Sequence, residues 1–384
     1  MGEQTKTPLW LDCDPGHDDA CAILLAAYHP SLELIGVSTV HGNAPLSRTT
    51  VNALSVLEAI GKPQIHVCPG SSKPFCRPGK TAPDIHGASG LAGTNLLPEP
   101  ARSALTHCNA ILEMKEALFS QPGGTAWLVA TGPLTNIALL FATFPSLADH
   151  IAGLAIMGGA IGSDFTHVSI VKPALFEKGF SSTEPPLTSS TPSKMGQPYL
   201  DTAGTSHARS GNSTPFAEFN IWADPESARS VLQSQTLAPK TTLIPLDVTH
   251  QAYATPKIQE MLLNGGRGPT RLRRMFNELL MFFARTYAEV FGLPDGPPLH
   301  DPLAVAAILS NHADEDVKIP FDDNGGERWV IDVILQGEQI GRTVITKSES
   351  GQGVRIPRTL DLDKFWRTLN ECMASADEMT RYGK

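Results

Sequence analysis

Acidic residues are concentrated near the start of the chain, directly after an apolar run. Residues 9–11 are followed by four aspartates within eight positions: Asp12, Asp14, Asp18 and Asp19. Carboxylates this close repel one another unless a cation is present, and oxygen ligands suit Ca²⁺ or Mg²⁺ better than zinc. The alternative is a capping cluster at the start of a buried helix, where Asp is favoured. Capping requires one aspartate and not four, so we interpret this stretch as a metal site.

The residues around these aspartates predict a strand, a tight turn and a helix. The apolar run before Asp12 is typical of a buried strand, and Pro15-Gly16 is typical of a turn. Residues 20–28 are almost all apolar or small, which predicts a buried helix. The carboxylates therefore lie at the carboxyl end of a strand, which is where open α/β sheets bind ligands.

Strand and helix patterns alternate along most of the chain. Further strands are predicted at 33–40, 65–68, 125–130, 153–157 and 242–245, and a hairpin at 329–335 and 340–345. Helices are predicted at 47–60, 104–119, from about 135 to 141, from 225, at 271–291, 302–309 and 363–374. This order predicts an α/β fold: one large, Rossmann-like domain over residues 1–384, with a mostly parallel central sheet flanked by helices.

Two stretches interrupt this alternation. Residues 69–100 form a long Gly/Pro-rich segment that contains His86, and long loops in compact α/β proteins are often functional. Residues 163–210 are rich in Ser, Thr and Pro and show no sustained periodicity. We interpret 163–210 as a flexible insertion within the domain, for which a lid is one role.

Composition excludes several classes of function. A net charge of −9 over 384 residues argues against a nucleic-acid partner, and the short basic cluster at 267–274 is expected to be a solvated helix face. Cys13, Cys21 and Cys68 lie in apolar segments, which predicts buried free thiols in a reducing compartment. With no long apolar run and no targeting pattern, we expect a cytoplasmic protein without a membrane partner.

More polar residues follow the later predicted strands or begin the later helices: Asn43, Thr131, Asn212, Glu218, Asn220, His300 and Asp301. Together with Asp-Cys-Asp-Pro-Gly-His-Asp-Asp-Ala at 12–20, these segments resemble the inosine–uridine-preferring nucleoside hydrolases. That family cleaves N-ribosides to ribose and free base. The resemblance runs from residue 9 to about 310, interrupted by the insertion, and implies the nucleoside hydrolase fold.

The resemblance implies a Ca²⁺ site and a base. The ligands would be Asp14, Asp19, Asp301 and the backbone carbonyl of Thr131, a donor set that fits a hard ion. Asp14 would also take a proton from the metal-bound water that attacks the anomeric carbon. Asp12 would be a supporting carboxylate behind the ligands.

The resemblance also implies how the nucleoside is bound and how its base leaves. Asn43 would act beside Asp14 and His300 in the catalytic set. His300 would protonate the leaving base, and imidazole has a suitable pKa for that task. A histidine that only bonds locally at a helix start is the alternative. The other substrate-binding positions match Asp18, His86, Met157, Asn212, Glu218, Phe219 and Asn220.

Within this set, Met157 would pack beneath the sugar, while His86 and Phe219 would lie near the base. Tyr287 is predicted to be a core aromatic, with closure over the base as the alternative. His17, His41 and His250 are predicted to be structural. We expect uridine as the substrate, with inosine second. The family forms dimers and tetramers, so the resemblance also implies a homo-oligomer.

Two other interpretations were weighed. A phosphatase of the haloacid-dehalogenase type also places Asp-x-Asp after a strand, but it usually has Thr or Val where Gly16 stands, and Asp18 and Asp19 have no role in it. The second is a calcium-stabilised, non-catalytic nucleoside- or ribose-binding protein on the same fold. The complete set of ligand, ribose and acid residues favours the enzyme.

Overall fold

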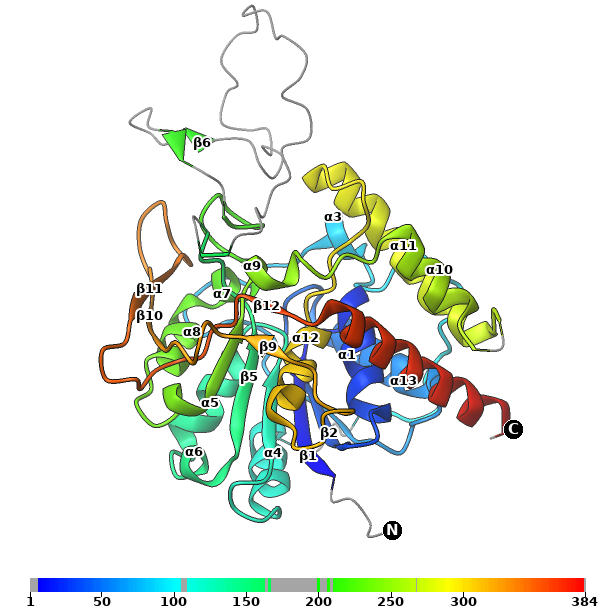
Figure 1. Ribbon diagram of the computed structural model, residues 1–384, viewed down its shortest axis with the longest axis horizontal. Coiled ribbons are helices and arrows are strands. Elements are labelled where there is room, and N and C mark those ends of the chain that lie inside the picture. The colour runs from blue at the N-terminus through cyan, green and yellow to red at the C-terminus, as the bar shows by residue number, and fades with distance from the viewer. Residues whose placement is uncertain are drawn as a thin grey trace, which may run out of the picture.

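The protein is built on a six-stranded parallel sheet. The computed structural model describes residues 6–104, 109–162, 165–166, 199–200, 206–207, 210–266 and 268–382. The strand order is β3-β2-β1-β4-β5-β8 (Figure 1). Their bounds are β1 Thr7–Cys13, β2 Leu32–Thr39, β3 Val67–Pro69, β4 Trp127–Ala130, β5 Gly153–Met157 and β8 Thr241–Ile244. The chain grows outward from β1 in one direction and then from β4 in the other, so a topological switch point lies between β1 and β4.

Helices cover both faces of this sheet because alternate strand residues point to opposite sides. Leu9 and Leu11 of β1 belong to one buried cluster, whereas Trp10 belongs to another. The first cluster contains residues of α1 His17–Tyr28, α2 Leu46–Ala59, α12 Pro302–Ala307 and α13 Leu362–Tyr382. The second contains residues of α4 Ala110–Phe119, α5 Thr135–Thr143, α6 Leu147–His150 and α8 Pro225–Leu232. The predicted fold class is confirmed.

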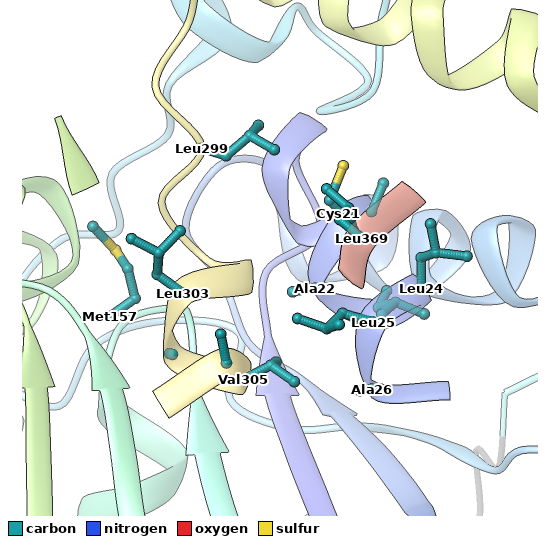
Figure 2. Close-up of a cluster of buried hydrophobic side chains, with 14 of the residues drawn as sticks. Cys21, Ala22, Leu24, Leu25, Ala26, Met157, Leu299, Leu303, Val305 and Leu369 are labelled. Atoms are coloured by element: carbon teal, nitrogen blue, oxygen red, sulfur yellow. The ribbon is translucent and has the colours of Figure 1, made fainter. Parts of the chain in front are cut away.

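Helix α1 is surrounded by other elements, which explains its almost continuous apolar sequence. Every residue from His17 to Ala26 is buried. Figure 2 shows Cys21 close to Leu369 of α13, and Leu303 of α12 between α1 and Met157 at the end of β5. A helix that is apolar all round is stable only when buried in this way. This packing holds the aspartate turn in front of α1 in a fixed place.

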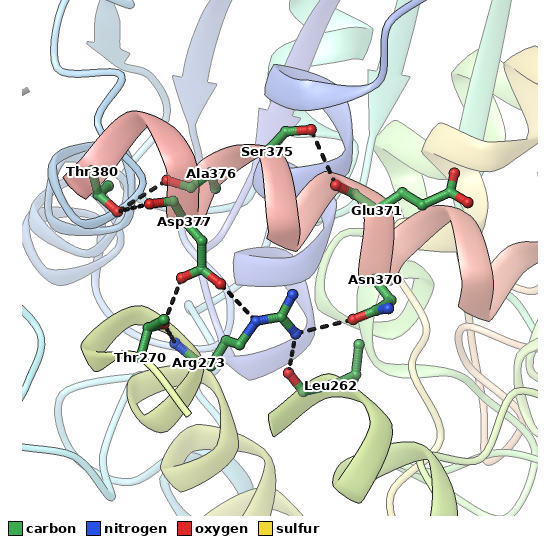
Figure 3. A network of polar contacts seen from close by, with 9 residues as sticks. All are labelled: Leu262, Thr270, Arg273, Asn370, Glu371, Ser375, Ala376, Asp377 and Thr380. Carbon is green, nitrogen blue, oxygen red and sulfur yellow. Dashed lines mark hydrogen bonds and ion pairs between the residues drawn. The ribbon is translucent and has the colours of Figure 1, made fainter. Parts of the chain in front are cut away.

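Helix α11 (Arg271–Phe291) carries a buried cation that the sequence pattern did not predict. Arg273 was expected on a solvated face, but its side chain is fully buried. Its Nε donates to Asp377 Oδ2 of α13 at 2.6 Å, and its Nη1 donates to Asn370 Oδ1 at 3.0 Å and to the carbonyl of Leu262 in α10 (Pro256–Asn264) (Figure 3). The expectation was wrong for Arg273 because it rested on local sequence, whereas the partners lie on other helices.

The remaining elements are short. They are α3 Pro83–His86, α7 Phe219–Ala223, α9 Leu246–Thr249, 3-10 helices Ala238–Lys240 and Ile308–Asn311, β6 Tyr199–Leu200, β7 Ser206–His207, β9 Phe321–Asp322, β10 Trp329–Val333, β11 Thr343–Lys347 and β12 Thr359–Leu360. The predicted hairpin is formed by β10 and β11, with its second strand three residues later than expected. The predicted helix at 104–119 begins only at Ala110, capped by the Asn109 side chain.

Other predictions concern the cysteines, a membrane span and the 163–210 insertion. Cys13, Cys21 and Cys68 are buried, as expected. Within the described residues, no helix is long and apolar enough to cross a membrane. Most of the 163–210 insertion lies outside the described residues.

Candidate active site

The predicted site residues come together at the carboxyl edge of the sheet, beside the switch point. They line one cavity, although they come from segments spread over most of the chain: Asp18, Asn43, His86, Thr131, Met157, Asn212, Glu218, Phe219, Asn220, His300 and Asp301. Asp14 and Asp19 are the predicted residues outside this lining, and both are fully buried. Asn43 connects them to the cavity, since its backbone N–H donates to Asp14 Oδ2 at 2.7 Å and its side-chain amide donates to Asp19 Oδ2 at 3.4 Å.

Three of the aspartates form a cluster that has the composition of a metal site. Carboxylate oxygens of Asp18, Asp19 and Asp301 all lie within 4.8 Å of one another. Burial raises the pKa of Asp18 to about 7, with repulsion by Asp19 adding to it. Burial, followed by the charge of Asp18, raises the pKa of Asp301 well above its ordinary value. A divalent cation would offset both the burial of these carboxylates and their mutual repulsion.

The cluster differs in one member from the predicted ligand set, which stays a prediction. Asp18, expected on the ribose side, joins Asp19 and Asp301. The carbonyl of Thr131 accepts a hydrogen bond from Asn220 Nδ2 at 2.8 Å, and the Thr131 hydroxyl donates to Asp19 Oδ1 at 2.9 Å. Asp14 Oδ1 is buried and has no hydrogen-bond partner among the described residues. Because a buried carboxylate oxygen without a donor is costly, this oxygen and the cluster together fit a hard cation.

The aspartates of this turn also make structural hydrogen bonds. Asp19 caps α1, because its Oδ2 accepts the backbone N–H of Gly16 at 2.8 Å. Asp12 lies behind the site, where its Oδ1 accepts hydrogen bonds from Ser38 and, at 2.8 Å, from Asn136. Burial raises the pKa of Asp12 to about 7. Asp19 is therefore both a cap of α1 and a member of the carboxylate cluster.

Two glycines allow the backbone to approach Asp14 closely. A Cβ atom on Gly42 would lie 2.0 Å from Asp14 Oδ2, and one on Gly132 would lie 2.7 Å from Asp14 Oδ1. Neither distance is compatible with a side chain at these positions unless Asp14 moves. The turns after β2 and β4 therefore enclose this carboxylate from two sides.

Glu218, Asn220 and Met157 are residues expected near the ribose. Glu218 caps α7: its Oε1 accepts from the N–H of Asn220 at 2.8 Å, and its Oε2 accepts from Gly159 at 2.9 Å and Ile221 at 3.1 Å. The side-chain amide of Asn220 donates to Thr131 and, at 3.3 Å, to the carbonyl of Met157. These bonds join the ends of β4 and β5 to α7 and hold the cavity floor rigid.

His300 is held at both ring nitrogens by side chains from other elements. Its Nδ1 lies 2.7 Å from the Thr249 hydroxyl of α9, and its Nε2 lies 2.7 Å from the Tyr287 hydroxyl of α11. Burial lowers the pKa of His300 well below its ordinary value. A histidine that only caps its own helix would not make these contacts, so the local alternative does not describe this side chain.

Tyr287 lies at the site, the alternative that sequence reasoning considered but did not favour. It was predicted to be a core aromatic; it is buried, but it also lines the cavity and contacts His300. Phe283, Tyr287 and Phe291 are spaced by four along α11 and all line the cavity. That spacing, which puts three aromatics on one helix face, was the signal available in the sequence.

His86 is held against the aspartate turn by a second histidine. Its Nδ1 lies 3.0 Å from Nδ1 of His17, whose Nε2 lies 2.8 Å from the carbonyl oxygen of Ala92. The His17 ring stacks on Phe282 and Phe283 of α11 at centroid distances of 5.2 and 5.3 Å. His17 therefore has contacts typical of a structural residue, and His86 lines the cavity as predicted.

The fold and this site together define an α/β protein with a cluster of buried carboxylates and a hydrogen-bonded histidine at the switch point of its sheet. Residues 9–367 match the family model described as inosine-uridine preferring nucleoside hydrolase. The chain is 35% identical to a uridine nucleosidase of Saccharomyces cerevisiae, over 99% of each protein. It is 30% identical to a pyrimidine-specific ribonucleoside hydrolase of Escherichia coli, over 96% of this chain and 97% of that protein.

Solved structures agree with these matches. A plant nucleoside hydrolase superimposes with a TM-score of 0.71 at 25% identity, over 96% of this chain and 98% of the other. A purine-preferring ribonucleoside hydrolase from Gardnerella vaginalis shares the fold, with a TM-score of 0.72 at 24% identity, over 97% and 99% of the two chains. The chain belongs to the inosine–uridine-preferring nucleoside hydrolase family, and it is an enzyme that hydrolyses ribonucleosides.

Proposed function

We propose that the enzyme cleaves the N-glycosidic bond of uridine, and of inosine as a second substrate, with Ca²⁺ held by Asp14, Asp18, Asp19 and Asp301. The observation that carries this proposal is the convergence of the aspartate cluster and the His300–Tyr287 pair on one cavity. The Thr131 carbonyl completes the proposed ligand set. When bound, the cation supplies positive charge that makes a neighbouring water more acidic and orients the ribose hydroxyls.

Asp14 is the proposed general base. Without a cation, burial and then the charge of Asp19 raise its pKa well above the ordinary value. Asp14 Oδ1 has no hydrogen-bond donor among the described residues, which leaves this oxygen able to accept a proton. In the reaction, the water oxygen bonds to the anomeric carbon and a water proton passes to Asp14. Asn43 holds Asp14 Oδ2 through its backbone N–H and so aims Oδ1, the oxygen without a donor.

The glycosidic bond breaks with its electron pair on the base nitrogen, and the proposed acid is His300 acting through Tyr287. The Thr249 hydroxyl donates to the Leu246 carbonyl at 3.5 Å. The Thr249 oxygen therefore accepts from His300 Nδ1–H at 2.7 Å. For this step His300 takes up a proton from solvent and passes its Nε2 proton to the Tyr287 oxygen as the Tyr287 hydroxyl proton moves to the base nitrogen. His300 is then left neutral, the form that burial favours by lowering its pKa.

Several features support a pyrimidine as the base. The Saccharomyces relative is named a uridine nucleosidase and the Escherichia relative is named pyrimidine-specific. Phe219, Phe283 and Phe291 line the cavity beside Tyr287, and aromatic rings stack well on nucleobases. Uracil leaves poorly without a proton, so an enzyme for uridine needs the acid that His300 and Tyr287 provide.

The experiment is steady-state hydrolysis of uridine, inosine, cytidine and adenosine by the full chain, with and without a calcium chelator. We expect ribose release that is fastest with uridine, stops with chelator and returns on adding Ca²⁺. Restoration by Mg²⁺ alone would contradict the choice of ion. Binding of nucleosides without ribose release from any of the four would overturn the proposal in favour of a non-catalytic binding protein.

The proposal includes the assembly and the location of the enzyme. By resemblance to the family, we propose a homodimer or homotetramer in the cytoplasm, with the ribonucleoside as its small-molecule partner. Sedimentation of the purified protein and fractionation of cells test these two points.

A further inference from the structure

A chain of three buried polar side chains lies outside the cavity lining and joins three segments of the protein. The Thr135 hydroxyl, at the start of α5, donates to Asp224 Oδ2 at 2.6 Å. His41, in the turn after β2, places its Nε2 3.1 Å from the same Thr135 oxygen. All three residues are buried, with exposed fractions of 2% or less. None of them has a role in the chemistry proposed above.

The direction of each hydrogen bond follows from the donors available. Asp224 accepts from four donors: Thr135, both the N–H and the hydroxyl of Ser227, and the N–H of Phe75. Because the single hydroxyl hydrogen of Thr135 goes to Asp224, the Thr135 oxygen accepts at its other side, and His41 Nε2–H is the donor. The chain of hydrogen bonds therefore runs from His41 to Thr135 and from Thr135 to Asp224, and the donor of each bond is assigned.

His41 belongs to the turn that carries Asn43. The His41 backbone N–H donates to the Ser71 carbonyl at 3.0 Å, so the turn is held by backbone as well as side chain. Two residues later, Asn43 donates to Asp14 Oδ2 at 2.7 Å from its backbone and to the Asp14 carbonyl at 3.2 Å from its side chain. Gly42 lies between His41 and Asn43 in the sequence and packs against Asp14. A shift of His41 would be transmitted directly to this short turn.

We propose that His41, Thr135 and Asp224 are positioning residues for the reaction: their hydrogen-bond chain fixes the turn that holds Asn43 against the catalytic aspartate. Thr135 lies four residues after Thr131, so the same chain ties the exit of β4 to the exit of β2. The inference rests on the proposed function, because it acts through the role assigned to Asn43 and Asp14.

The test compares two hydroxyls that bond the same carboxylate oxygen. Thr135→Val keeps the shape of the side chain and removes the bond to His41 and the bond to Asp224. Ser227→Ala is the matched control, because it removes a 2.7 Å bond to Asp224 Oδ2 without touching His41. We expect Thr135→Val to lower kcat on uridine at least tenfold with KM within about twofold, Thr135→Ser to restore most of the rate, and Ser227→Ala to stay within about twofold.

A double-mutant cycle with Asp14→Asn separates positioning from general loss of structure, because the Asn43 backbone N–H that holds Asp14 is kept in any Asn43 variant. If the chain acts by placing Asp14, Thr135→Val slows the Asp14→Asn enzyme by less than about twofold, whereas independent effects would multiply. Multiplying effects, or equal losses in Thr135→Val and Ser227→Ala, would overturn the inference. If Thr135→Val fails to fold, His41→Leu takes its place in the same cycle, with circular dichroism as the check.

The outcomes distinguish this inference from the proposed function. A wild-type enzyme that releases no ribose overturns the proposed function. A wild-type enzyme that is active, with a Thr135→Val rate that is unchanged, overturns only the positioning role.

Discussion

Replacing Tyr287 with phenylalanine tests the route of the proton to the base with the smallest change of shape. The substitution removes one hydroxyl, which lies 2.7 Å from His300 Nε2. Proton transfer to a leaving group contributes about 10²–10⁴-fold in rate, which corresponds to about 3–5 kcal/mol in the activation free energy. The structural cost of the lost hydrogen bond is about 1 kcal/mol in the free energy of unfolding. The expected loss in activation free energy is therefore several times larger than the expected loss in the free energy of unfolding.

The assay compares uridine with p-nitrophenyl riboside, whose leaving group needs no proton. We expect Tyr287→Phe to lower kcat on uridine by about 10²-fold or more while the rate on p-nitrophenyl riboside changes less than about threefold. His300→Ala should show the same selectivity, because both residues belong to one route. Equal losses on the two substrates would refute the acid role and indicate that the pair only shapes the pocket.

Three further predictions concern charge. Asp14→Asn should lower kcat on uridine more than about 100-fold, and retained activity would show that another base serves. The same substitution should raise the melting temperature of chelator-treated protein, because a buried carboxylate that is repelled by its neighbours becomes neutral. Asp377→Asn should lower the free energy of unfolding in urea by about 3 kcal/mol, because it leaves the buried guanidinium of Arg273 unpaired. Glu315→Gln, which breaks an exposed pair with Lys318, is the control and should cost less than about 1 kcal/mol. Burial, assisted by His312, lowers the pKa of His29 from 6.5 to about 4. The unfolded chain therefore binds more protons between these values, and stability should fall by up to about 3 kcal/mol as pH drops from 6.5 to 4. His29→Asn should flatten that part of the pH–stability curve, and an unchanged curve would contradict the assignment.

The sequence alone predicted the order and type of the main elements and most of the residues that the structure brings to the cavity. Continuous apolar runs predicted the buried parallel strands, and Asp14, Asn43 and Asp301 were proposed because they follow strands or begin helices and because their segments resemble those of the family. Parallel strands bring their carboxyl ends to one edge of the sheet, so polar residues at those ends meet whatever the details of packing. This rule is local in sequence and needs no knowledge of which helix contacts which.

The tertiary structure decided which side chains touch. It brought Asp18 into the carboxylate cluster with Asp301, 283 positions away in the chain, and it placed Tyr287 against His300. It also buried Arg273, which sequence pattern placed in solvent, because its partner Asp377 lies on another helix. Contacts of this kind depend on how the elements pack against one another. Local propensity and periodicity contain no record of a partner on another element, whether it lies 13 positions away, as for Tyr287 and His300, or 104, as for Arg273 and Asp377.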